Sequence, residues 1–568
     1  MRRVNVSTLM LSGAFALPAA MVGLVAGLAQ AALLTTGDVN PVNSANWTNG
    51  STVSIGTTSN GAVVLDSGST VNLGSVTANL GNAAGVTGTI SVDGAGSAWQ
   101  GFGASRITAG NGAGGIGVIN LTNGGLMSGL SLRVGFANNS TGILNISNGG
   151  ILANGAALGD AVGSTGIATV DGAGSQLNNA LAVGDRGTGL LTIKNGASAT
   201  TYYGTVGRYS TGTGIVVVDG PGSSWNVGTS GLQVGIGIDG GGGVGRLTVT
   251  NGAVLAVDGS VQDSGLGIFN GSKGTVMVNG ASSQWTNLHG VHVGQSGTGQ
   301  LSLSDGAAFT ASALTINSAS VVTMDVGTGS TVTSTGALIN DGTIRMAAKA
   351  TAANGTYTPI SAGSWSGSGQ VQALGGVYDQ TNHSVTVSTA ATGQAGVATT
   401  IDRAVTQRML ITDSATGKLV GASFQAATAP SSLSLTAALM NPSQVSVLQG
   451  LLTPGQAVLG AWDFSATGYT TGDPVYLSLQ VDGGQKFYDL NLWHYNGLSW
   501  DRYLNTDLAY DGTFASFVAT SFSGYAVSGV APVPVPAAVW LFGSGLAAIV
   551  EMRRRNKIKT PESQGIHF

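Results

Sequence analysis

The stretch GILNISNG at residues 142–149 returns in altered form along the middle of the chain, as GLLTIKNG at 189–196 and GRLTVTNG at 245–252. In each copy the apolar residues recur at period two, as Leu144 and Ile146 do. This alternation is typical of a β-strand with one buried face. The Asn-Gly pair that follows favours a tight turn, because both residues tolerate positive φ. Each copy therefore predicts one strand and the turn that ends it.

The repeat has nine imperfect copies with a period of about 25 residues. A second short strand ending in Gly precedes the first, as in LRVG at 132–135 and LAVG at 181–184, and a third strand follows the turn. Three short strands per repeat predict one triangular rung of a parallel β-helix, with rungs stacked at ~4.8 Å. The predicted β-solenoid covers residues 86–310. The glycines that mark the nine copies are Gly94, Gly124, Gly149, Gly172, Gly196, Gly220, Gly252, Gly280 and Gly306.

The repeats are of two kinds that largely alternate. One kind ends in an Asp-Gly or Asn-Gly box followed by a tryptophan, at Trp99, Trp225 and Trp285, and a further copy has Leu177 at that place. The other kind reads Asn-Gly-Gly or Asn-Gly-Ala. Because the tryptophan recurs at one position of the rung and leucine can replace it, we interpret it as core or corner packing. Stacking of these indoles on sugars is the alternative.

The composition fits a chain of many turns and few charges. Gly accounts for 93 of 568 residues, charged residues make up 8%, and there is no Cys. Glu occurs only at Glu551 and Glu562, so the body between the two ends carries 23 Asp against 14 Lys and Arg, a net charge of about −9. A surface of this sign argues against nucleic acid as a partner. No motif for a cofactor is recognisable, so none is predicted.

The N-terminal end carries an export signal. Arg2 and Arg3 precede a long apolar stretch that closes with Ala29-Gln30-Ala31. A positive start, an apolar run and an A-x-A site are typical of a secretory signal peptide, here residues 1–31, cleaved by signal peptidase. The protein is therefore expected to pass through the inner membrane.

The C-terminal end, residues 531–568, has three parts. Two prolines come first, then 14 apolar residues between Pro536 and Glu551, and finally an arginine cluster that should stay cytoplasmic. The apolar run is short for a comfortable membrane span, although the residues before it extend it. The residues expected to matter for sorting are Pro534, Pro536, Trp540, Arg553, Arg554 and Arg555.

This tail resembles the PEP-CTERM sorting signal of Gram-negative bacteria. The resemblance implies recognition by an exosortase, removal of the tail and release to the cell surface or matrix, with a transient hold on the inner membrane. A permanent C-terminal anchor is the alternative. The repeats over 86–310 resemble those shared by type V autotransporters and PEP-CTERM proteins, so both resemblances imply the same exported context.

The other segments complete the predicted organisation. Residues 32–85 are expected to form an N-terminal cap with the first rungs, and 311–395 to form degenerate rungs. Residues 396–452 are expected to be a linker with a short helix at 401–410. Alternating strands and aromatics over 453–530 predict a small antiparallel β-sandwich. The predicted fold is all-β: a parallel β-helix, then this sandwich, then a C-terminal apolar helix.

Aspartates are the main candidates for chemistry. Asp160 and Asp185 occupy the same place in adjacent rungs and could lie about 5 Å apart, as the carboxylates of retaining glycosidases do. Arg186 and Arg208 are expected to lie beside them and would neutralise them, so a solvated charge ladder is favoured over a catalytic pair. The aspartates that precede Gly in turns predict self-bonding turn geometry, with Ca²⁺ binding as the alternative; they are Asp93, Asp171, Asp219 and Asp305.

These observations favour a non-enzymatic protein of the cell surface or matrix, whose solenoid is a displayed scaffold for adhesion or for association with exopolysaccharide in a biofilm. Two alternatives stay open. One is a β-helix enzyme that acts on polysaccharide through Asp160 and Asp185. The other is a glycan-binding module at 453–530 that uses Trp493 and Trp500.

Overall fold

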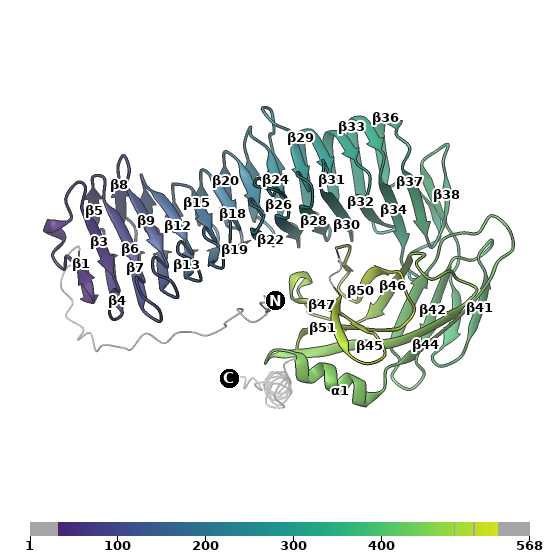
Figure 1. Cartoon of the computed structure of the whole chain (residues 1–568). Helices are drawn as coiled ribbons and strands as arrows, with labels where there is room; N and C mark the ends of the chain where they lie inside the picture. Colours follow the sequence, from purple (N-terminus) through teal and green to yellow (C-terminus); the bar gives the residue numbers. More distant parts are fainter. Residues whose placement is uncertain (1–31, 482, 504–505, 532–568) are drawn as a thin grey trace, which may run out of the picture.

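The computed structural model describes residues 32–481, 483–503 and 506–531, and it consists of a long β-solenoid followed by a β-sandwich (Figure 1). One wall of the solenoid is a 14-stranded sheet, called sheet A, in which the first strand is antiparallel and the other thirteen are parallel. This confirms the predicted parallel β-helix. The strands of sheet A are β1 (Ala32–Gly37), β4 (Gly61–Asp66), β7 (Thr87–Asp93), β10 (Ile116–Thr122), β13 (Thr141–Ser147), β16 (Thr165–Asp171), β19 (Thr188–Lys194), β22 (Thr213–Asp219), β25 (Val244–Thr250), β28 (Lys273–Asn279), β30 (Thr298–Ser304), β32 (Val321–Val326), β34 (Thr343–Ala348) and β37 (Gln370–Leu374).

The other two sides of each rung belong to a 22-stranded sheet, called sheet B. In most rungs these sides are two short strands, so three strands make one turn, as predicted. The strands of sheet B are β2 (Val39–Asn40), β3 (Thr52–Ile55), β5 (Thr70–Leu73), β6 (Thr77–Leu80), β8 (Ala98–Gly101), β9 (Arg106–Ala109), β11 (Leu126–Ser128), β12 (Ser131–Val134), β14 (Ile151–Leu152), β15 (Ala156–Leu158), β17 (Gln176–Asn178), β18 (Leu181–Val183), β20 (Ser198–Thr201), β21 (Gly204–Val206), β23 (Ser224–Val227), β24 (Leu232–Val234), β26 (Val254–Val257), β27 (Ser264–Leu266), β29 (Gln284–Val293), β31 (Ala308–Ile316), β33 (Thr331–Asn340) and β36 (Ile360–Ser366).

The repeat sequence determines the register of the rungs. Leu144 of β13 pairs with Ala168 of β16, and Ile146 pairs with Val170, so like positions stack on like positions. These inward residues are buried, whereas the residues between them face outward. At the turn after β13, Asn148 has φ 51° and the following glycine φ 81°, which is the left-handed geometry that an Asn-Gly turn requires.

The recurring tryptophans lie inside the solenoid. Trp99 is 2% exposed, and Trp225 and Trp285 are 0% exposed. Leu177, at the same place in its own rung, is also fully buried. The core-packing interpretation is therefore confirmed, and these indoles are not available for stacking on sugars.

Both ends of the stack differ from its middle. At the start, β1 runs antiparallel to β4 and β2 antiparallel to β3, and the Trp47 ring lies 5.8 Å from that of Trp99. From β29 onward, the two short strands of a rung merge into one strand of up to ten residues with a bulge, for example between Asn287 and Gly290. Rungs without the repeat box continue to β36 and β37. A three-stranded sheet follows, made of β35 (Gly355–Tyr357), β38 (Val377–Asp379) and β39 (Ser384–Val387).

The sandwich consists of two six-stranded sheets, antiparallel except for the pair β40–β42, which share one hydrophobic core. It was predicted over 453–530 but begins near residue 391, so it is larger than predicted. One sheet contains β40 (Ala391–Gln394), β42 (Arg408–Thr412), β43 (Leu419–Ser423), β46 (Val475–Gln480), β49 (Ala509–Tyr510) and β50 (Phe514–Ala519). The other contains β41 (Thr399–Asp402), β44 (Ser432–Leu439), β45 (Gln456–Thr467), β47 (Asn491–Tyr495), β48 (Trp500–Tyr503) and β51 (Gly524–Val530).

The expected linker at 396–452, with a helix at 401–410, is wrong. Ile401 lies on β41 and Met409 on β42, and both side chains are buried in the core of the sandwich. Tertiary pairing with β44 and β43 therefore overrides the weak local preference of this segment. The helix in this region is α1 (Pro442–Leu451), which has Asn441 as its N-cap.

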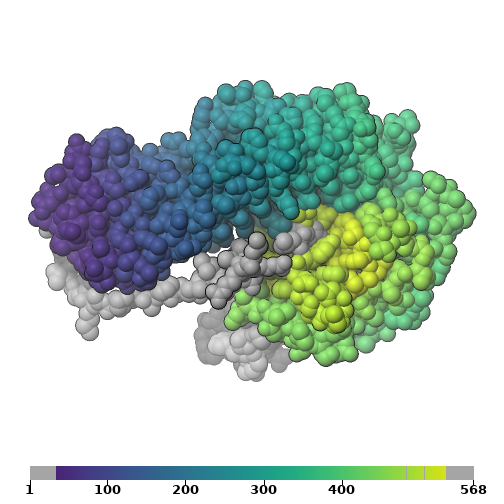
Figure 2. Space-filling view, viewed as in Figure 1, coloured from purple at the N-terminus to yellow at the C-terminus, as the bar shows by residue number. Residues whose placement is uncertain are grey.

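The sandwich folds back against the outer face of sheet A (Figures 1 and 2). The outward residues of sheet A, half-buried on the free rungs, become buried where the sandwich covers them, as Met277 and Ser302 do. Met277 belongs to the hydrophobic core of the sandwich, and the Tyr488 hydroxyl donates to the Asp219 carboxylate at 3.3 Å. The two parts therefore share a packed interface.

A buried set of charges lies in this interface and is called here the lysine cluster: Lys349, Asp305, Asp325 and Asp511. The Lys349 ammonium lies 2.5 Å from Asp305 Oδ1, 3.1 Å from Asp511 Oδ2 and 3.9 Å from Asp325 Oδ2. Its side chain is 3% exposed. Burial by itself lowers the pKa of Lys349, but the carboxylates together raise it above its ordinary value. One cation thus holds three acids, one of which comes from the sandwich.

The lysine cluster predicts a pH dependence of stability. Burial, and then the charge of Asp325, raises the pKa of Asp305 from 3.8 to about 6. Between pH 4 and pH 6 the folded chain therefore binds a proton that the unfolded chain has released. The free energy of unfolding should fall as pH rises through this window, by on the order of 3 kcal/mol for a shift of this size.

Chemical denaturation at several pH values checks this prediction. Asp305→Asn is the matched control, because asparagine has the same shape and tolerates the φ of 58° found there. The variant should lose the fall in stability between pH 4 and pH 6. Parallel curves for the two proteins would contradict the assignment.

The two predicted signals lie outside the described residues. These are the signal peptide with Ala29 and Ala31, and the sorting residues of the tail with its apolar helix. In the part that the structure describes, no helix has the length and apolar character to cross a bilayer.

Candidate functional site

A hollow on the solenoid lies across four successive rungs, at β12, β15, β18 and β21. Two ladders of outward side chains define it. Along the strands, Arg133 is in register with Ala157, then Ala182, then Thr205. The side chains of Ala157 and Ala182 are short, and they lie between the longer Arg133 in the rung before and Thr205 in the rung after. They therefore leave a depression over the two middle rungs. We call this depression the groove.

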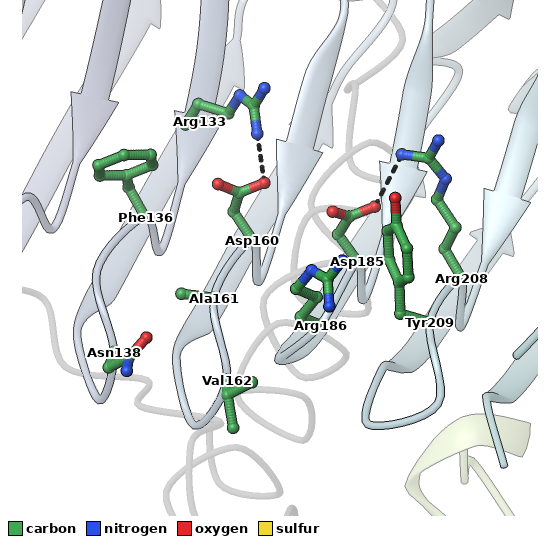
Figure 3. A pocket seen from close by; sticks show the side chains of 10 residues that line it. All are labelled: Arg133, Phe136, Asn138, Asp160, Ala161, Val162, Asp185, Arg186, Arg208 and Tyr209. Carbon is green, nitrogen blue, oxygen red and sulfur yellow. Dashed lines mark hydrogen bonds and ion pairs between the residues drawn. The ribbon is translucent and has the colours of Figure 1, made fainter. Parts of the chain in front are cut away.

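The second ladder lies where each of these strands turns toward sheet A. The residue after the turn glycine is Phe136, Asp160, Asp185 and Arg208 in successive rungs. The backbone places them one above another, as when the Arg208 N–H donates to the Gly184 carbonyl at 3.0 Å. Two acids therefore stand side by side, with an aromatic ring before them and an arginine after them (Figure 3).

Each acid forms an ion pair with an arginine on its outer side. Arg133 Nη1 lies 2.5 Å from Asp160 Oδ1, and Arg208 Nη1 lies 3.1 Å from Asp185 Oδ1. The acid side chains are about 10% exposed, whereas the arginines are 39% and 36% exposed, so the acids are deep and the arginines form the rim. Burial raises the pKa of Asp185, and the charge of Asp160 adds to this, against the opposing effect of Arg208.

An aromatic ring with a guanidinium over it stands at each end of the groove. The Arg106 guanidinium lies 5.4 Å from the centre of the Phe136 ring. At the other end, the Arg186 guanidinium lies 3.9 Å from the centre of the Tyr209 ring. Asp239 holds Arg186 there through an ion pair of 3.2 Å. Both rings are therefore fixed by cation–π contacts.

The groove consists of two adjoining hollows. The first has a volume of about 490 Å³ and is lined by both acids, three arginines and the two rings. The second, of about 290 Å³, lies over Ala157 and Ala182, and it shares Arg133, Asp185 and Arg208 with the first. These dimensions suit a ligand of a few sugar units or of similar size.

The sequence predicted that Arg186 and Arg208 neutralise the two acids. This prediction is confirmed for Arg208 and wrong for Arg186. Arg208 pairs with Asp185 as expected. Arg186 does not pair with Asp160, because it stacks on Tyr209 and binds Asp239 two rungs further on. The partner of Asp160 is Arg133 of the preceding rung, which sequence reasoning missed. Arg133 is in register with Ala157 of the next rung, and Asp160 lies three residues further along, so their separation of 27 residues is one rung plus three residues.

The turn aspartates bond mainly between rungs and not to their own turns. Asp93 Oδ1 accepts from Asn123 at 2.7 Å, and Asp171 accepts from Asn195 at 2.7 Å. Asp93 and Asp171 thus each hold the Asn-Gly turn of the next rung, and Asp219 does the same with Asn251. Asp305 differs, because it accepts from Asn279 of the preceding rung and from Lys349. Among the described residues, no group of three or more acidic or histidine side chains could hold a metal ion.

The two tryptophans proposed for glycan binding in the sandwich have structural contacts. Trp500 is 6% exposed, and its indole N–H donates to the Gln444 carbonyl of α1 at 2.9 Å. Trp493 is half-buried and donates to Ser528 Oγ at 2.9 Å. Trp500 therefore cannot stack on a sugar without leaving the core.

No protein-family model matches the chain, and no curated protein is significantly similar to it. Function must therefore be inferred from the fold and the groove.

Proposed function

We propose that this protein is a non-enzymatic scaffold, displayed at the cell surface or in the extracellular matrix for adhesion or for association with exopolysaccharide. The observation that carries the proposal is the unbroken stack of thirteen parallel strands in sheet A around one hydrophobic core. Such a stack is rigid and presents similar polar side chains at a constant interval. This arrangement suits many weak contacts with a polymer.

The groove supports binding over catalysis. A retaining glycosidase needs one carboxylate as nucleophile and a second as proton donor. Here each carboxylate is held by an arginine, Asp160 by Arg133 and Asp185 by Arg208. Burial raises the pKa of Asp185, but the hydrogen bond and charge of Arg208 oppose this shift and favour the ionised carboxylate. A polysaccharide-active enzyme remains the alternative, and it predicts turnover that is lost in Asp185→Asn.

Export and sorting rest on the two ends of the sequence. The signal peptide at 1–31 and the tail with Arg553–Arg555 support passage through the inner membrane and processing by an exosortase. Removal of the tail would leave the solenoid and the sandwich as the displayed body. A permanent anchor would instead keep this body at the membrane.

Fractionation of the host with C-terminal mapping tests the proposal, in strains with and without the exosortase. The expected result is a mature chain that begins at Ala32 and lacks Arg553–Arg555, found at the surface or in the matrix in the exosortase-positive strain alone. A chain that keeps the arginines in the inner membrane of both strains would overturn the sorting step. A chain that stays in the cytoplasm would overturn the whole proposal.

A further inference from the structure

We infer that the groove between Arg133 and Arg208 is a binding site for an uncharged, linear oligosaccharide segment that lies along the solenoid axis. This inference rests on the proposed association with exopolysaccharide and specifies where that contact occurs and which class of glycan is bound. The side-chain chemistry, the charge balance and the shape of the groove each support it.

The acids are placed to accept hydrogen bonds from a ligand. The ion pairs engage Oδ1 of both Asp160 and Asp185. Within the described residues, neither Oδ2 atom has a hydrogen-bond partner. An ionised carboxylate only accepts hydrogen bonds and a guanidinium only donates them. A sugar hydroxyl does both, so neighbouring hydroxyls can donate to Asp185 while they accept from Arg208.

The charges of the groove select an uncharged ligand. Three arginines and two aspartates line the groove. Arg133 pairs with Asp160, Arg208 with Asp185, and Arg186 with Asp239 just beyond the lining, so these charges cancel pairwise. An anionic chain would place carboxylates against buried Asp160 and Asp185, and an amine would meet the arginines at the rim. Either arrangement costs electrostatic free energy, because like charges at close range repel strongly where water is partly excluded.

The shape of the groove selects a linear ligand. Phe136 and Tyr209 stand three rungs apart, about 14 Å along the axis at a strand spacing of ~4.8 Å. Between the two rings the hollow is lined by the two acids together with Ala161 and Val162, and Ala157 and Ala182 form an apolar floor in the adjoining hollow. Sugar rings have apolar faces that pack on such a floor and on aromatic rings, while their hydroxyls point to the sides. Three or four sugar units would fill this length.

Titration calorimetry with defined oligosaccharides tests the inference on the full-length protein purified from its host. The probes are cellotetraose, laminaritetraose and mannotetraose as neutral chains, tetragalacturonate as an anion, and a tetramer of glucosamine as a cation. We expect at least one neutral tetramer to bind, and to bind more tightly than both charged tetramers.

Two variants locate the binding. Ala157→Trp fills the floor of the groove from an outward position and should abolish binding. Ala256→Trp, at an outward position of β26 that lines neither hollow, is the matched control and should bind normally. The double variant Asp185→Asn and Arg208→Gln keeps the net charge. It should weaken binding about tenfold or more, since the hydrogen bonds that sugar hydroxyls would form with Asp185 and Arg208 both involve charged groups.

The inference is overturned if no neutral tetramer binds, if a charged tetramer binds more tightly, or if Ala157→Trp binds as well as the unaltered protein. These outcomes leave the proposed surface display untouched, because fractionation measures display without reference to the groove. Conversely, binding by a chain that remains in the cytoplasm would support the groove and refute the display.

Discussion

Replacing Lys349 with methionine should lower the free energy of unfolding by about 3–5 kcal/mol. Methionine has a similar length but no charge, so Asp305 and Asp325 would remain buried without their cation. The cost of an uncompensated buried carboxylate is large because its hydration is not replaced. Asp511 of the sandwich would lose the same partner, so the contact between sandwich and solenoid should weaken as well.

Guanidinium denaturation at pH 7 measures this loss, and repetition at pH 5 provides an internal check. At the lower pH the raised pKa of Asp305 allows that acid to become neutral, so the penalty of Lys349→Met should shrink. Lys194→Met is the matched control, because the Lys194–Asp171 pair is about one-third exposed and should contribute under about 1 kcal/mol. Equal losses for both variants would show that the cluster is not a special feature of the interface.

Replacing Trp285 with alanine should cost about 3–5 kcal/mol. The indole is fully buried between two rungs, in register with Leu255 on one side and Phe309 on the other, and its ring centre lies 4.9 Å from that of Phe309. Its N–H has no hydrogen-bond partner within the described residues, so the loss is one of packing. A solenoid rung contacts only its neighbours, so the cavity cannot be filled from elsewhere.

A leucine at the same place should cost clearly less than alanine. Leu177 occupies the equivalent position of another rung and is fully buried there, so the fold accepts this side chain. Thr286→Ala, at the next and outward-facing position, is the control and should change stability little. Thermal unfolding followed by circular dichroism ranks the variants. A Trp285→Ala protein as stable as Thr286→Ala would refute the role of the indole in the core.

The solenoid could be predicted from the sequence because its determinants are local. The inward pair Leu144 and Ile146 and the Asn148 turn recur in each copy, and stacking repeats them in space. The sandwich was harder to predict. Its first strands, β41 and β42, have only short apolar patterns around Ile401 and Met409. These patterns do not identify strands by themselves, because β41 and β42 are stabilised by pairing with β44 and β43.

The groove was predicted in part. Asp160 and Asp185 could be placed in adjacent rungs by counting residues from each turn glycine. The partner of Asp160 could not be assigned in this way, because the number of residues per rung varies and a shift of one residue turns a side chain to the other face. The lysine cluster was beyond reach, since Lys349 and Asp511 are 162 residues apart in different parts of the fold.

The solenoid begins with the reversed strand β1 and ends beside the sandwich, and this gives the rod a fixed length. Thirteen parallel strands at ~4.8 Å measure about 60 Å. A parallel rung from another copy would meet the wrong hydrogen-bond pattern at β1, which disfavours growth into a fibre. The length of the rod is thus set by the number of repeats, and duplicating one repeat would lengthen the rod by one strand spacing, ~4.8 Å.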